Sequence, residues 1–208
     1  RSALLGAARS AEAAYPLITA LPADGPEPLE VAPETPAGNR VAIRQTLDCE
    51  EALDEALDRA EQGQQVLWIE NTVSEAQEAF KLLAARSSGM EIECGLLHSR
   101  FIHRDREALE DEWVTRYGAD GAAARRERGR ILIGTQVLEQ SLDIDADFLV
   151  TRLCPTDMLL QRIGRLWRHS FHQRPAGARC EAWIVSAQFE AAERNPGEAF
   201  GNSAKVYS

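Results

Sequence analysis

The segment 161–169, which reads QRIGRLWRH, places three arginines behind a glutamine and around a glycine. Its spacing predicts a helix on which Gln161, Arg165 and Arg168 share one stripe, at i, i+4 and i+7. Planar guanidinium groups bind phosphate oxygens in pairs, and phosphoryl transfer raises the charge on those oxygens. The stripe therefore indicates polyphosphate binding, and the alternative is an amphipathic surface helix with solvated arginines.

Gly164 interrupts this predicted helix. A glycine inside a helix costs roughly 1 kcal/mol relative to alanine, so we expect another group to approach the backbone there. Leu159, Ile163 and Leu166 are expected to form the buried face of the same helix.

Upstream, residues 131–151 contain two short apolar runs, 131–133 and 148–150, joined by a polar connection. Such runs are typical of buried parallel strands. The connection carries Thr135, Gln136 and Asp143 after the first strand, where open α/β sheets place their ligand contacts. For Asp143 a second interpretation stays open, in which it is a turn residue that caps local N–H groups.

Two earlier segments follow the same pattern of a strand and then polar residues. In residues 66–80 a strand precedes Thr72 and Glu75, a capping-box spacing that starts a helix whose N-terminus can bind a phosphate. In residues 95–106 a strand ends at His98 or Ser99 and a basic loop with Arg100 follows. The alternative for the first segment is an ordinary strand-turn-helix unit, and His98 is expected to be structural.

In their order, these four segments resemble motifs IV, IVa, V and VI of superfamily 2 helicases. The phrase GTQVLEQSLDID followed by LLQRIGRLWRH is similar to the CRISPR-associated helicase-nuclease of type I interference systems. The resemblance covers residues 66–169 and implies the second RecA-like lobe, an α/β fold with a parallel sheet and helices on both faces. DEAD-box and RecQ-like relatives usually carry Gly-Leu-Asp or Gly-Ile-Asp where this chain has Ser141, Leu142 and Asp143.

The resemblance also implies a role for each matching residue. Arg165 and Arg168 would be the fingers that reach the γ-phosphate of ATP, supported by Gln161 and Arg162, while Asp143 would accept from the ribose. The implied contacts to DNA backbone phosphates are Thr72, Ser99, Arg100, Thr135 and Gln136. The implied partners are single-stranded DNA, a first RecA-like lobe and a nuclease domain of the same protein, and the CRISPR surveillance complex.

Other parts of such an enzyme have no counterpart in this sequence. Its two lysines, Lys81 and Lys205, form no Gly-Lys-Ser/Thr phosphate loop, and no His-Asp doublet of a metal-dependent nuclease occurs. We therefore expect ATP and Mg²⁺ to be bound mainly by the first lobe, no metal in this chain, and no ATP hydrolysis by the chain alone. Two alternatives remain: a non-catalytic RecA-like interaction lobe, or a lobe of another superfamily 2 DNA or RNA helicase.

Charge is unevenly distributed along the chain, whose net charge is −10 over 208 residues. Residues 1–65 hold twelve acids against five arginines, whereas residues 151–180 hold six arginines against Asp157 alone. A positive nucleic-acid track can therefore coexist with an acidic total. No apolar run is long enough for a membrane span, and no signal peptide is recognisable, so we expect a cytoplasmic protein without membrane contact. The four cysteines show no CxxC spacing, which indicates reduced, buried thiols and no zinc site.

The domain organisation expected from the sequence has three parts. Residues 1–45 form the N-terminal segment and inter-lobe connection, with alanine-rich helical character over residues 1 to about 20 and a proline-rich extended stretch after it. Residues 46–190 form the RecA-like lobe, and residues 191–208 form a polar tail that would lead to a further C-terminal region. Within the lobe, helices are expected at residues 48–63 and 104–117, a helix or loop at 122–130, and a last strand at 181–186.

Overall fold

The computed structural model describes residues 18–20, 29–31, 40–140, 142–187, 193–199, 203 and 206. The chain divides into two compact units, Arg1–Gly38 and Asn39–Ser208. In the first unit, β1 (Ile18–Ala20) and β2 (Leu29–Val31) pair as antiparallel strands. The helical character expected for residues 1–20 is therefore wrong at Ile18–Ala20 and lies outside the described residues elsewhere. β2 also adds a strand to the segment that was expected to be only an extended connection.

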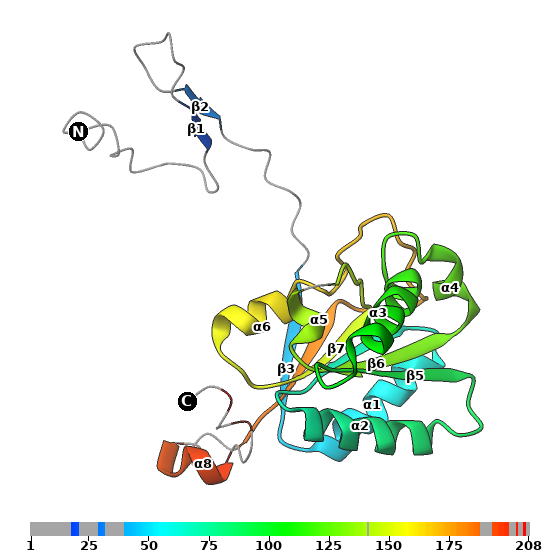
Figure 1. Ribbon diagram of the computed structural model, residues 1–208, viewed down its shortest axis with the longest axis vertical. Helices are drawn as coiled ribbons and strands as arrows, with labels where there is room; N and C mark the ends of the chain where they lie inside the picture. Colours follow the sequence, from blue (N-terminus) through cyan, green and yellow to red (C-terminus); the bar gives the residue numbers. More distant parts are fainter. Residues whose placement is uncertain are drawn as a thin grey trace, which may run out of the picture. The chain divides into compact units, whose positions relative to one another are not determined.

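Six parallel strands form the sheet of the second unit, in the order β3-β8-β7-β4-β6-β5 (Figure 1). In chain order they are β3 (Ala42–Thr46), β4 (Gln65–Ile69), β5 (Ile92–Leu97), β6 (Gly129–Gly134), β7 (Phe148–Arg152) and β8 (Glu181–Val185). All residues of β4 and β6 are buried, which is why residues 66–69 and 131–133 within them are apolar. β3 crosses the boundary that was expected between the N-terminal segment (residues 1–45) and the RecA-like lobe (residues 46–190).

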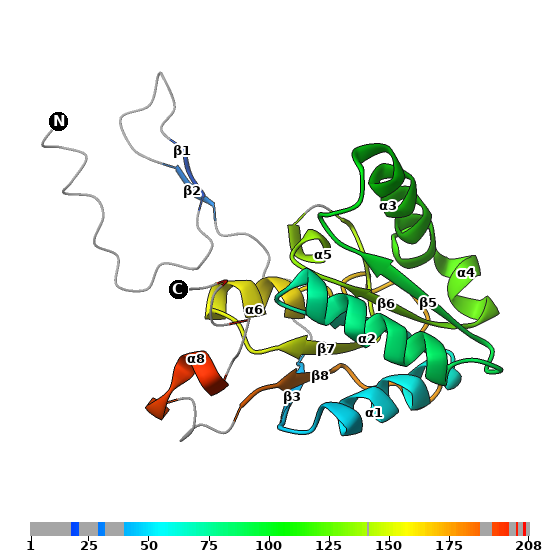
Figure 2. The same cartoon turned by 60° about the horizontal axis from the view of Figure 1, so that its bottom comes forward.

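Helices cover both faces of this sheet, as predicted (Figure 2). Against one face pack α1 (Cys49–Glu61) and α2 (Val73–Arg86). On the other face lie α3 (His103–Tyr117), α5 (Val137–Gln140) and α6 (Thr156–Ile163), with α4 (Ala122–Glu127) beside α3. The tail contains α8 (Pro196–Ala199), and Ser203 donates to Glu75 over 3.2 Å. None of the helices in the described part of the chain has the length and apolar content that a membrane span requires.

Local sequence signals account for the ends of α1 and α2. Asp48 caps α1 by accepting from the backbone N–H of Glu50 over 2.8 Å, and Thr72 forms the predicted capping box with Glu75 at the start of α2. Because α2 follows β4 directly, this cap fixes where the chain leaves the carboxyl edge of the sheet.

Trp113 packs over the backbone of β5 at Gly95. A Cβ atom on Gly95 would lie 1.8 Å from Cζ2 of Trp113, so only glycine leaves room for the indole ring. Trp113 is buried and joins Tyr117 in the core on the α3 face. The predicted helix or loop at 122–130 is a helix only to Glu127, because β6 begins at Gly129.

The helix predicted to run through Arg168 ends at Ile163, so that prediction was wrong. Leu166 instead forms a parallel bridge with Ala146, and Trp167 has a positive φ of 48° that a helix cannot continue. No described group of this chain outside the turn itself makes the close approach expected at Gly164. A Cβ there would meet only carbonyl oxygens of its own turn, the nearest 3.3 Å away at Leu160. Pairing with residues 142–147, which lie far away in sequence, has overridden the helical spacing.

Candidate functional site

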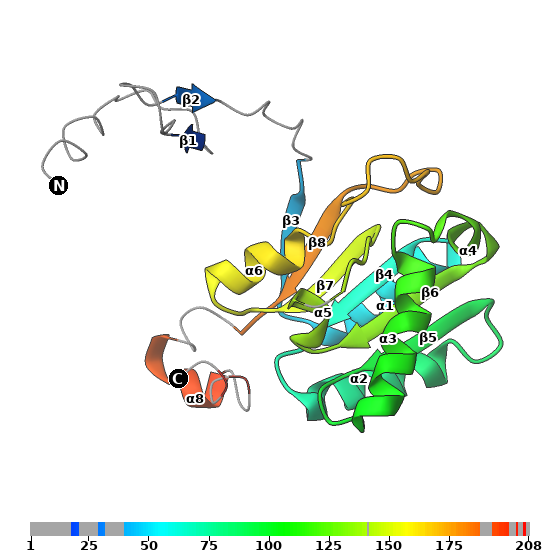
Figure 3. The ribbon, with the colours of Figure 1, turned by 45° about the horizontal axis from the view of Figure 1, so that its top comes forward.

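The motif V loop (residues 135–140 and 142–147) and the motif VI turn (residues 164–169) are joined backbone to backbone. Ala146 donates its N–H to the carbonyl of Arg165 over 2.9 Å and accepts from the N–H of Trp167 over 3.0 Å. Both segments lie on the α3 face of the sheet, where Leu166 is part of the core (Figure 3). These bonds bring Arg165, Arg168 and Asp143 into one site, although they are not on one helix.

Arg165 is buried, with 8% of its surface exposed. Its Nη1 donates to the carbonyl of Leu142 over 2.5 Å, and its Nη2 donates to the carbonyl of Glu139. Burial, and then the charge of Arg168, lower the pKa of Arg165. The guanidinium thus supports the motif V loop in this structure. Its Nε has no hydrogen-bond partner among the residues that the structure describes.

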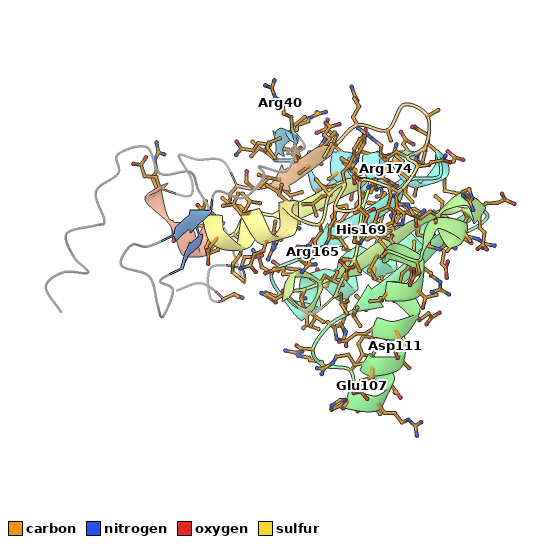
Figure 4. The ribbon with its side chains drawn as sticks, turned by 90° about the horizontal axis from the view of Figure 1, so that it is seen from above. Arg40, Glu107, Asp111, Arg165, His169 and Arg174 are labelled. Carbon is orange, nitrogen blue, oxygen red and sulfur yellow. The ribbon has the colours of Figure 1, made fainter. Side chains whose placement is uncertain are left out.

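Arg168 and Asp143 form an exposed pair at the mouth of the same site. Nε of Arg168 donates to Oδ1 of Asp143 over 2.7 Å, and Nε2 of His169 lies 3.2 Å from Oδ2 of Asp143. The backbone of His169 accepts from Arg174, so the loop before β8 also reaches this turn (Figure 4). Asp143 is therefore more than a cap of local N–H groups, because its partners come from the motif VI turn.

Arg162 lies in the core instead of facing the site. Its side chain is 0% exposed, its Nε donates to Oε1 of Glu139 over 2.7 Å, and its Nη1 donates to Oγ1 of Thr151 over 2.7 Å. Burial raises the pKa of Glu139, against the opposing charge of Arg162. In this arrangement Arg162 has no exposed atom to offer a nucleotide, while Gln161 stands exposed on α6.

The predicted DNA contacts follow the ends of β4, β5 and β6 at the carboxyl edge of the sheet. Gln136 donates to the carbonyl of Asn71 over 3.0 Å, which links the motif V loop to the start of α2. The hydroxyl of Thr72 is engaged in its capping box, and Thr135 is buried. Ser99 and Arg100 are exposed. Their loop is held by His98, whose Nδ1 accepts from the N–H of Arg100 over 3.3 Å and whose ring stacks on Phe101.

A buried charged cluster behind the motif VI turn was not predicted. It consists of two aspartates at alternate positions after Asp143 and three partners from other segments: Asp145, Asp147, Arg125, His172 and Arg174. The alternation of aspartates just before an apolar strand was a visible signal, because strand-like spacing turns alternate side chains to the same side.

The side chains of this site suit phosphate and hydroxyl ligands better than a metal. Guanidinium groups pair with phosphate oxygens, and one exposed carboxylate can accept from a sugar hydroxyl. Among the residues that the structure describes, no three His, Cys, Asp or Glu side chains are grouped so as to hold a metal ion. The four cysteines are free and partly buried.

The family described as "CRISPR-associated nuclease/helicase Cas3, C-terminal" matches residues 62–171, more than half of the chain. The chain belongs to the Cas3 family. The match contains both the motif V loop and the motif VI turn, and with the parallel sheet it confirms the predicted helicase C-terminal lobe with its RecA-like fold.

Cas3 relatives resemble this chain over most of its length. The CRISPR-associated endonuclease/helicase Cas3 of Escherichia coli K12 is 36% identical over 156 residues, which are 75% of this chain and 16% of that protein. A crystal structure of T. fusca Cas3-ATP is 29% identical with a TM-score of 0.74, over 86% of this chain and 22% of that one. A chain in a structure of a CRISPR RNA-guided surveillance complex, described as pre-nicking, is 32% identical with a TM-score of 0.63. The match covers 73% of this chain and 19% of that chain. The chain thus spans less than a quarter of the length of these relatives.

Proposed function

We propose that this chain is the second motor lobe of an ATP-dependent single-stranded-DNA translocase that acts in type I CRISPR interference. The observation that carries the proposal is the junction of the motif V loop and the motif VI turn, which gathers Arg165, Arg168 and Asp143 through backbone hydrogen bonds. The Cas3 relatives support it, since one is described with ATP and another in a surveillance complex.

Within this function, Arg168 and Arg165 are the fingers for the γ-phosphate. ATP, when bound, supplies the phosphoryl group whose charge rises during transfer, and guanidinium forks stabilise such charge. Arg168 would exchange Asp143 for phosphate oxygens, which frees Asp143 to accept from a ribose hydroxyl. Arg165 would have to leave the carbonyls of Leu142 and Glu139 that it binds in this structure.

Gln161 and Arg162, the other two residues expected at the nucleotide, have different roles in the proposed function. Gln161 is exposed on α6 and can reach a nucleotide directly. Arg162 acts from the core by holding Glu139, the residue whose backbone carbonyl Arg165 binds. Mg²⁺ and most phosphate contacts would come from a first RecA-like lobe of the same protein, so this chain alone would be inactive.

Single-stranded DNA would cross the carboxyl edge of the sheet. Ser99, Arg100 and Gln136 can offer side chains to backbone phosphates, whereas Thr72 and Thr135 would contribute through the backbone of the segments they start. Such contacts read no base sequence, as a translocase requires. A nuclease domain of the same protein and the surveillance complex would be the further partners, in the cytoplasm where the target DNA lies.

Substitution of the two fingers in the full-length protein tests the proposal. Arg165→Ala or Arg168→Ala should lower DNA-stimulated ATP turnover by ~10³ or more, the scale of a lost arginine finger. Arg→Lys at either position should not restore it, because an ammonium group cannot form the planar fork. Arg179→Ala, which removes an exposed arginine outside the site, is the matched control.

One observation favours a second candidate function, a RecA-like lobe that binds DNA or protein without serving an ATPase. Arg165 already has carbonyl partners for both terminal nitrogens, as a purely structural arginine would. In that case all four substitutions at Arg165 and Arg168 should leave ATP turnover within a few-fold of wild type, and the motor assignment would be lost.

A further inference from the structure

Asp145 is completely buried directly behind the turn that carries Arg168, and its carboxylate is surrounded by donors. Oδ1 accepts from the backbone N–H of Arg168 over 2.8 Å and from Nη2 of Arg174 over 2.9 Å. Oδ2 lies 2.7 Å from Nδ1 of His172, whose Nε2 lies 3.0 Å from the carbonyl of Ala119. A carboxylate with this many donors is held in one orientation.

The residue before Arg168 has a backbone conformation that needs such support. Trp167 has a φ of 48°, in the left-handed region that side-chain-bearing residues adopt at a cost of roughly 1–3 kcal/mol. Its N–H donates to Ala146 over 3.0 Å, its Nε1 donates to the carbonyl of Asp147 over 3.2 Å, and Arg174 lies over its ring. The turn is therefore held both at Trp167 and, through Asp145, at the N–H of Arg168.

Arg174 completes the support because it joins the two buried aspartates. It pairs with Asp145 and with Asp147 over 2.8 Å each. Burial alone would lower the pKa of Arg174, but its hydrogen bonds to Asp145 and Asp147 raise the pKa above the ordinary value. The carboxylate of Asp145 accepts a hydrogen bond from the motif VI turn, at the N–H of Arg168. The carboxylate of Asp147 accepts from three other segments, at Gln65, Arg125 and Arg174.

We infer that Asp145 is a positioning residue for Arg168: it fixes the backbone from which the finger extends, while the finger's side chain stays free to exchange Asp143 for a phosphate. This inference rests on the proposed function of Arg168. A guanidinium misplaced by about 1 Å loses about 10²-fold in rate, so holding the backbone matters even though Asp145 touches no nucleotide.

Asp145→Asn in the full-length protein tests the inference, with Asp147→Asn as the matched control. Both aspartates are buried and both bind Arg174, so the loss of that partner is common to the two variants. Asp145→Asn should lower kcat for ATP by ~10² with KM changed less than about threefold, while Asp147→Asn should stay within a few-fold of wild type. Equal kcat losses in the two variants would show a merely structural role and overturn the inference.

A double substitution shows whether Asp145 acts through Arg168. In an Arg168→Ala background, Asp145→Asn should lower kcat no further, because the group that it positions is gone. Losses that multiply would overturn the inference while leaving the finger assignment intact. Wild-type turnover of Arg168→Ala itself would instead remove the proposed function, whatever Asp145→Asn does.

A second variant keeps the test decisive where Asp145→Asn does not fold. His172→Gln keeps the carboxylate and its bond to Arg168 but alters the ring that orients Oδ2. It should lower kcat by a smaller factor, with KM unchanged, and should lose this effect in the Arg168→Ala background. A kcat equal to wild type, or an effect that persists without Arg168, would count against the inference.

Discussion

Nε of Arg168 lies 2.7 Å from Oδ1 of Asp143, in a pair whose side chains are 43% and 50% exposed. An exposed ion pair of this kind contributes at most about 1 kcal/mol, so a polyphosphate can displace Asp143 at little cost. Arg162 and Glu139 form the opposite kind of pair, with both side chains 0% exposed. We therefore expect Arg168 to exchange Asp143 for another anion, whereas Arg162, six residues earlier, is expected to keep Glu139 and to stabilise the fold.

This difference predicts unequal effects on stability. Arg162→Met should lower the free energy of unfolding by ~3–5 kcal/mol, because it leaves the carboxylate of Glu139 buried without its partner. Arg168→Met should cost no more than about 1 kcal/mol. Urea denaturation of the chain measures both. Adding Glu139→Leu to Arg162→Met should recover much of the loss, and similar costs for the two single variants would contradict the prediction.

ATP hydrolysis by the chain alone should be absent. The nucleotide side of the site offers guanidinium groups and one exposed carboxylate, but no grouped ligands for Mg²⁺ among the described residues. Phosphate release with saturating single-stranded DNA should equal the buffer background. Turnover that survives repurification and disappears in Arg165→Ala would show a complete active site in this chain.

DNA binding by the chain should be weak, indifferent to sequence and steeply reduced by salt, because backbone contacts release counterions. Titrations with labelled single strands of two sequences at several salt concentrations test this. Arg100→Gln should reduce the slope of log affinity against log salt by about 1, since it removes one phosphate contact. Arg179→Gln, outside the DNA track, should leave the slope unchanged. A strong preference for one sequence at high salt would argue against a translocase track.

His98 should make the stability of the chain depend on pH. Burial, and then the charge of Arg100, lower the pKa of His98 from its ordinary value of 6.5. As pH falls from 6.5 to the lowered value, the unfolded chain binds a proton that the native chain does not, so the free energy of unfolding falls in this window and levels off below it.

Denaturation of wild type and His98→Gln across this window isolates the effect, and NMR titration of the ring reports the pKa directly. The stability advantage of wild type over His98→Gln should shrink as pH falls. His103→Gln, which replaces an exposed histidine, is the control. An advantage that grows on acidification would mean that the native state favours the charged ring.

Replacement of Gly95 and of Gly164 by alanine should affect stability differently, because Gly95 packs against a ring and Gly164 only ends a helix. Gly95→Ala should cost at least about 1–3 kcal/mol, because its Cβ would overlap the ring of Trp113. Gly164→Ala should change stability by less than about 1 kcal/mol, since no described atom outside its own turn lies within 4 Å of the added Cβ. Thermal unfolding of both variants decides between these outcomes, and a severe Gly164→Ala would reveal a contact to that backbone.

Local patterns predicted the elements whose signals are complete within a short segment. The apolar runs of β4 and β6, the capping box at Thr72 and the amphipathic spacing of α1 each need only neighbouring residues. With the motif order, these signals predicted a parallel sheet covered on both faces.

Features that depend on distant partners could not be predicted in this way. The end of α6 is set by the bridge between Leu166 and Ala146. In the sequence Arg162 cannot be distinguished from the neighbouring arginines, and only its contact with Glu139 in the fold shows that it is a core residue. β3 has four exposed residues in five, so its sequence lacks a buried-strand signal, and only β8 makes it a strand. Asp145 likewise gained its inferred role from donors 23 to 29 residues away.

The pairing of β3 with β8 has a mechanical consequence. The chain enters the sheet through β3 and leaves it through β8, and these strands lie side by side and parallel, from Ala42 opposite Glu181 to Thr46 opposite Val185. Tension between the segments before Ala42 and after Val185 pulls the two strands in opposite directions along their length. The hydrogen bonds between them are then loaded together in shear instead of opening one at a time. In the proposed motor lobe, tension that enters through β3 and β8 would therefore meet the hydrogen bonds of this strand pair in shear.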